Sequence, residues 1–166
     1  MSSSRLSEQL LLVAKARIGD KAVRNEASLR RATSDLYYVA FHTICEALVE
    51  PMFRAGPANK AFVETYTKLY RQLNHGYAER RCKAVAQGGE FSAEIARFAK
   101  LFIELKNKRE SADYDPLDKF AVSIVRNDLE KVESRLQAFW KADSAERAAF
   151  ACFVGLRWTK DHQEIG

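Results

Sequence analysis

The stretch that decides the fold is Leu29–Leu48, which reads LRRATSDLYYVAFHTICEAL. Its apolar residues recur every three or four positions, which predicts a helix with one wide buried face. This face comprises Leu29, Ala32, Leu36, Ala40, Ile44 and Leu48, with Tyr37, Phe41 and Cys45 one step along. A second row on the same helix consists of Arg31, Asp35, Tyr38 and His42. Their spacing places a cation, a carboxylate, a phenol and an imidazole along one edge, so we treat them as candidate functional residues.

The rest of the chain is also patterned as helices, since no run alternates with the two-residue period of a strand. We expect six helices, over about residues 4–18, 26–53, 59–86, 92–112, 123–141 and 144–159. The third should break near Asn74, with Gly76 as a left-handed cap. Asn59 and Ser144 are expected to cap helices, and the fourth helix should start at Ser92. Short connections predict an all-α fold, an antiparallel up-and-down bundle of five to six helices.

Each expected helix has its own apolar row, which should face the core. The rows are Leu10, Val13 and Ala14; Phe62, Tyr66, Leu69, Tyr70 and Leu73; Ile95, Phe98, Leu101, Phe102 and Leu105; Ile124, Val125, Leu129, Val132 and Leu136; and Phe150, Phe153, Val154 and Trp158.

The 166 residues fit a single domain, residues 1–166, with a bundle core at about 26–140 and an extra helix at about 144–159. No stretch approaches the roughly 20 apolar residues of a membrane span. The apolar run near the N-terminus is too short for a secretory signal, so we expect a cytoplasmic protein without a membrane partner. The three cysteines lack zinc spacing, and the sequence indicates no metal and no cofactor. The net charge of +5 permits an anionic partner such as RNA or a nucleotide.

A second group of polar residues lies at the end of the helix expected to finish near Ala112. Arg109 continues the row of Phe102 and Leu105, so it is rooted beside the core. Asp113, four residues on, can face it across one helical turn. Because Pro116 disfavours helical geometry before it, Tyr114 should lie at a helix end, where it can meet a ligand. The alternative is a partly buried Arg109–Asp113 pair with a purely structural role.

His75, in the segment YRQLNHG at 70–76, is a candidate general acid or base, because an imidazole titrates near pH 6.5. It could equally bond backbone carbonyls at a helix end, and His42 could be a histidine satisfied at the core margin. The phosphate loop GxxxxGK[ST], the dinucleotide motif GxGxxG, HExxH and GxSxG are all absent from the sequence.

The segments LRRATSDLYYVAFH (29–42) and RESADYD (109–115) together resemble the HEPN superfamily of nucleotide-binding domains, in its bacterial branch with YYxxFH and RxxxDY motifs. YRQLNHG is also similar to this branch. The resemblance implies an antiparallel helical bundle that forms homodimers. It further implies a toxin-type or defence-associated ribonuclease, often paired with a nucleotidyltransferase-like protein partner as its antitoxin. The implied active site is an arginine followed four to six residues later by a histidine, duplicated across the dimer.

This sequence departs from that motif. Arg109 matches the arginine, but Asp113, Tyr114 and Asp115 stand where the histidine is expected. We therefore hypothesise that His42 or His75 supplies the imidazole from another helix. Arg109 would then stabilise a phosphate, while Tyr38 or Tyr114 orients it.

A binding module without chemistry is the competing prediction. In that case Arg31–Asp35 and Arg109–Asp113 are buried pairs that fix the register of the helices. The basic surface would then bind a nucleotide, RNA or a protein without cleaving anything. A partner-neutralising antitoxin is a third possibility. Geometry separates the first two, because catalysis needs Arg109 and an imidazole at one open site.

Overall fold

The computed structural model describes residues 5–22, 24–53 and 59–157. These residues form seven α-helices and no strand: α1 (Leu6–Gly19), α2 (Glu26–Val49), α3 (Lys60–Tyr70), α4 (His75–Gly88), α5 (Ala93–Tyr114), α6 (Val122–Lys141) and α7 (Ser144–Gly155). The predicted all-α class is confirmed. The number of helices was underestimated by one, because the segment predicted as one broken helix forms two separate helices, α3 and α4.

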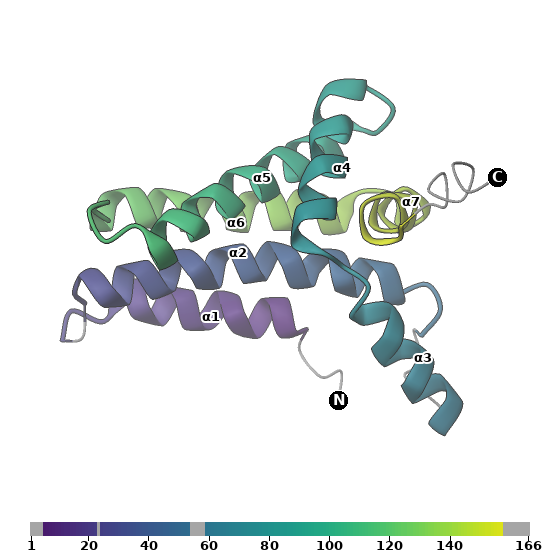
Figure 1. The fold of residues 1–166 in the computed structure, drawn as a ribbon, viewed down its shortest axis with the longest axis horizontal. Helices are drawn as coiled ribbons and strands as arrows, with labels where there is room; N and C mark the ends of the chain where they lie inside the picture. The colour runs from purple at the N-terminus through teal and green to yellow at the C-terminus, as the bar shows by residue number, and fades with distance from the viewer. Residues whose placement is uncertain (1–4, 23, 54–58, 158–166) are drawn as a thin grey trace.

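Helices α1, α2, α5 and α6 lie side by side, and each runs antiparallel to the one before it in this group (Figure 1). Helix α2 is central and contacts α1, α3, α5, α6 and α7. Helix α3 departs from the group, α4 crosses it, and α7 is seen end-on (Figure 1). An up-and-down order is therefore seen in these four helices and not in α3, α4 and α7 (Figure 1). Among the described residues, no helix combines the length and the apolar character needed to cross a membrane.

The apolar face predicted for α2 is buried, including the whole side chain of Tyr37, except at Phe41, which is partly buried. The row predicted on α5, from Ile95 to Leu105, is buried as well. Phe98 joins α5 to the neighbouring helices, with its ring 4.4 Å from that of Phe139 and 6.0 Å from that of Phe150. These contacts fasten α5, the helix that carries Arg109, to α6 and α7.

Three residues that were predicted in the core are exposed: Val13, Phe62 and Ile124. Helix α3 buries none of its residues, because α2 is the only helix against which it packs extensively. Ile124 lies in the first turn of α6, and its neighbour Val125 takes the inward position instead. Trp158 and the end of the last expected helix lie outside the described residues.

Helix ends also differ from the prediction at several points. Asn59 caps α3 as expected, accepting from the Phe62 N–H at 3.1 Å. Asp143, rather than Ser144, caps α7, with its side chain accepting from Glu146 N–H at 3.0 Å. Aspartate competes well for this position because its carboxylate also interacts favourably with the helix dipole. Ser92 stands at the start of α5, but its hydroxyl makes no capping bond.

Gly76 was wrongly predicted as a left-handed cap. It lies in the first turn of α4, and the only positive φ among the described residues is 69° at Gly89, which ends that helix. Asn74 instead acts as the N-cap of α4, with its side chain accepting from the Tyr77 N–H at 3.0 Å. A good N-cap starts a new helix there, and it fixes His75 at the first helical position.

Asn74→Ala should therefore lower the free energy of unfolding by about 1 kcal/mol, the usual cost of losing an N-cap side chain. Asn74→Asp should restore most of the loss, because aspartate caps equally well. Urea denaturation followed by circular dichroism measures both changes. Equal stability of the alanine and aspartate variants would contradict the capping role.

Candidate functional site

Arg109 extends from α5 over the surface of α2 and meets three aromatic rings. Its Cζ atom lies 6.0 Å from the ring centre of Tyr37, 5.9 Å from Tyr38 and 5.6 Å from Tyr114. The side chain keeps 21% of its surface exposed. An arginine so placed is held by cation–π contacts and still reaches solvent, which suits recognition of an anion.

Asp113 faces Arg109, as the four-residue spacing predicted. Arg109 Nε lies 2.7 Å from Asp113 Oδ2, although this ion pair falls outside hydrogen-bond geometry. The other oxygen, Oδ1, accepts from the hydroxyl of Ser34 at 2.5 Å and so ties the end of α5 to α2. With 19% of its side chain exposed, Asp113 partly neutralises the guanidinium at its own surface.

His75 lies against the same two tyrosine rings as Arg109. Its ring centre is 5.7 Å from that of Tyr37 and 6.4 Å from that of Tyr38, and the ring stacks on Phe41 at 4.5 Å. Burial, together with the nearby cations Arg109 and Lys106, lowers the pKa of His75. The imidazole is therefore neutral at pH 7 and shares one electrostatic environment with Arg109.

The hydrogen bond between Tyr37 and His75 Nδ1 bears on the chemistry of this site. Burial raises the pKa of Tyr37, so the residue stays a phenol. A phenol is the better donor of the two groups, and with Tyr37 donating, the neutral ring carries its proton on Nε2. That N–H has no hydrogen-bond partner among the described residues and can donate to a phosphate oxygen.

His42 also lies near Tyr38, with the ring centres 6.4 Å apart, but its hydrogen bond is to α3. Its Nδ1 is 2.8 Å from the Tyr70 hydroxyl on α3, and the two rings stack at 5.7 Å. Its pKa is lowered by burial alone, with no contribution from Arg109. Of the two histidines named in the hypothesis, the structure therefore brings His75, and not His42, into electrostatic contact with Arg109.

The four side chains predicted along one edge of α2 do not face a common site. They are Arg31, Asp35, Tyr38 and His42. Tyr38 faces Arg109 and His42 faces α3, whereas Asp35 turns to α1, where its Oδ2 accepts from Arg17 Nε at 2.8 Å. The hypothetical Arg31–Asp35 pair is therefore corrected to Arg17–Asp35. Burial raises the pKa of Asp35, and the hydrogen bond and charge of Arg17, with a smaller effect of the charge of Arg31, oppose that rise. Arg31 is exposed.

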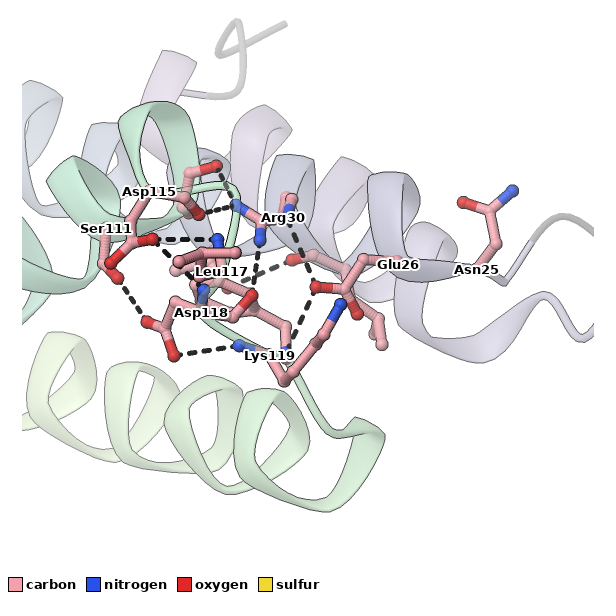
Figure 2. A network of polar contacts seen from close by, with 12 residues as sticks. Asn25, Glu26, Arg30, Ser111, Asp115, Leu117, Asp118 and Lys119 are labelled. Carbon is pink, nitrogen blue, oxygen red and sulfur yellow. Dashed lines mark hydrogen bonds and ion pairs between the residues drawn. The ribbon is translucent and has the colours of Figure 1, made fainter.

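Arg30 is the residue that sequence reasoning missed. Its Nη1 donates to the carbonyls of Ala112 at 3.0 Å and Asp115 at 2.8 Å, and its Nη2 donates to the carbonyl of Asp118 (Figure 2). Its Nε donates to the carboxylate of Glu26 at 3.2 Å. One arginine thus fastens the α5–α6 loop, residues 115–121, to the start of α2. The sequence feature that could have pointed to Arg30 is Glu26, which stands four residues before Arg30 on the same face of the helix.

A surface pocket of about 480 Å³ opens between the start of α2 and this loop. Asp113 and Tyr114 line it, so it adjoins the Arg109 site directly. Among the described residues, no group of three or more histidine, cysteine or acidic side chains is placed to hold a metal ion. A scan of protein-family models and searches of curated proteins and of solved structures find no significant match.

Proposed function

We propose that this chain is an HEPN-like protein that binds RNA or a nucleotide at a phosphate site formed by Arg109 and His75. The observation that carries the proposal is that the Arg109 guanidinium and the His75 imidazole lie against the same rings, Tyr37 and Tyr38. Both groups are donors suited to phosphate oxygens. The resemblance adds a homodimer and a nucleotidyltransferase-like protein partner to the proposal.

Ribonuclease activity is the second candidate function. In that reaction the 2′-hydroxyl loses its proton to a base and attacks phosphorus, and the 5′ oxygen leaves with a proton, giving a 2′,3′-cyclic phosphate and a 5′-hydroxyl end. Neutral His75 favours this candidate, since a neutral imidazole can act in proton transfer. The donation from Tyr37 favours simple binding, because it occupies Nδ1 and leaves a donor at Nε2. Binding is therefore the primary proposal.

The test is binding of a fluorescent single-stranded RNA, followed by anisotropy, with wild type, Arg109→Ala and Arg97→Ala. Arg97 is the matched control, because it lies on the same helix and its partner is Glu94 at 3.7 Å. Hydrogen bonds to charged groups contribute about 1.5–3 kcal/mol, so Arg109→Ala should weaken binding by about 10-fold or more. Equal affinities of the two variants would contradict the proposal.

Asp113→Asn tests the same site, with an expected change in RNA affinity opposite to that of Arg109→Ala. If Arg109 binds phosphate, removing the facing negative charge should tighten RNA binding by a few-fold, because the guanidinium is no longer neutralised. If Arg109 and Asp113 only hold α5 in place, Arg109→Ala and Asp113→Asn should both lower the free energy of unfolding, and the two variants should bind RNA with the same affinity.

Cleavage is tested by incubating unlabelled RNA with wild type, Arg109→Ala and His75→Gln. Equal residual cleavage by all three proteins would indicate contamination.

A further inference from the structure

We infer that the pocket beside Arg109 is a guanine-selective base site, so that the ligand is a guanine nucleotide or a guanine in RNA. This inference rests on the proposed phosphate site. The pocket is lined by Glu26, Arg30, Asp113, Tyr114, Asp115 and Lys119, together with small apolar groups, and its volume of about 480 Å³ exceeds that of one nucleobase. A base in this pocket would keep its phosphate near Arg109, because Tyr114 borders both sites.

Tyr114 offers a ring face for stacking. The residue is 73% exposed, although most large apolar and aromatic side chains of α5 are buried. Among the described residues its ring packs on no other aromatic ring, and its one ring contact is with the Arg109 guanidinium at 5.6 Å. An aromatic side chain that contributes little to the core but borders a pocket is suited to stacking on a base.

The pocket also holds unused hydrogen-bonding capacity. Glu26 accepts through Oε1 from Arg30 Nε at 3.2 Å and from Phe120 N–H at 3.4 Å. Asp115 accepts through Oδ1 from the loop N–H groups of Leu117 and Asp118. Within the described ranges, Glu26 Oε2, Asp115 Oδ2 and the Lys119 ammonium make no hydrogen bond or ion pair. Two carboxylate oxygens and one ammonium of pocket-lining residues are therefore left without a hydrogen bond or ion pair among the described residues, and the network around them is drawn in Figure 2.

Guanine is the base that combines two adjacent donors for a carboxylate with acceptors for an ammonium. Its N1–H and N2–H₂ are adjacent donors that one carboxylate can accept together, and its O6 and N7 are acceptors that an ammonium can satisfy. Adenine has a single amino donor on that edge and no carbonyl, while uracil presents one N–H between two carbonyls that the carboxylates would repel. Arg30 holds the loop that carries Asp115 and Lys119, so these groups are ordered before a ligand arrives.

Calorimetric titration of the full chain with guanosine 5′-monophosphate, adenosine 5′-monophosphate and ribose 5-phosphate tests the inference. We expect at least a 10-fold preference for the guanine nucleotide. Tyr114→Ala should weaken binding of that nucleotide by about 10-fold and binding of ribose 5-phosphate less, because only the nucleotide loses a stacking contact, whereas both lose the ring beside Arg109. Glu26→Gln should reduce the preference for guanine over adenine. Leu117→Ala, an exposed residue of the same loop outside the pocket, is the control and should bind as wild type does.

The outcomes separate the two proposals. Equal affinity of the wild type for the guanine and adenine nucleotides would overturn the base site. A Tyr114→Ala variant that loses affinity for ribose 5-phosphate as strongly as for the guanine nucleotide would overturn it too. In both cases Arg109→Ala would still weaken binding of all three probes. If Arg109→Ala binds every probe as wild type does, the phosphate site is wrong. Absence of binding of all three probes to the wild type at millimolar concentration would contradict both.

Discussion

Phe102→Ala is expected to lower the free energy of unfolding by about 3–5 kcal/mol, a large share of the stability of a domain of this size. The Phe102 side chain is completely buried on α5, and its ring lies 5.5 Å from that of Tyr37 on α2. Truncation leaves a cavity between the two helices that carry the candidate site, and the close-packed surroundings relax only partly. Urea denaturation followed by circular dichroism measures the loss.

Phe62→Ala provides the matched control, because it makes the same truncation at an exposed position. Phe62 is 46% exposed on α3, and its ring meets Phe53 at 6.1 Å. We expect a loss of about 1 kcal/mol or less. Comparable losses at the two positions would mean that α3 is packed as tightly as α5, contrary to the described fold.

Arg30→Ala is expected to cost about 2 kcal/mol, the second large effect on stability. The substitution removes donors to three carbonyls of the α5–α6 segment, an ion pair to Glu26 and a cation–π contact 5.0 Å from the Phe120 ring. Hydrogen bonds to charged groups contribute about 1.5–3 kcal/mol each when buried, but solvent reaches part of this network and replaces some of them. Hydrogen exchange should also speed up in residues 115–121, which lose their anchor.

Arg31→Ala is the control for this prediction, since Arg31 is adjacent in sequence but exposed, and it makes no hydrogen bond or ion pair in the described part of the chain. Its effect on the free energy of unfolding should stay within about 0.5 kcal/mol. If Arg31→Ala destabilises the protein as much as Arg30→Ala, the network in Figure 2 does not hold the loop.

The sequence predicted the features that depend on one helix. The buried face of Leu29–Leu48, the row from Ile95 to Leu105 and the Arg109–Asp113 pair all follow from helical spacing. Exposure of Phe62 was not predictable in this way, because the apolar stripe of α3 shows that a face exists and not that another helix covers it.

Partners from distant segments also escaped prediction. Arg17 reaches Asp35 and Arg30 reaches Asp118 only after α1 and the α5–α6 loop have packed onto α2. For the same reason, the sequence could not show which of the two histidines lies near Arg109. Neither histidine's place in the sequence shows which group it meets; only the fold brings His75 near Arg109 and His42 to Tyr70.

The measurement that tests the shared Arg109–His75 site most directly is an NMR titration of the histidine Cε1 protons in wild type and Arg109→Gln, with His75→Gln and His42→Gln used for assignment. Removing the nearby positive charge removes one cause of the lowered pKa of His75, so its pKa should rise toward about 6.5. The pKa of His42, which burial alone lowers, should not change. An unchanged pKa of His75, or equal shifts at both histidines, would contradict a site in which Arg109 and His75 act together.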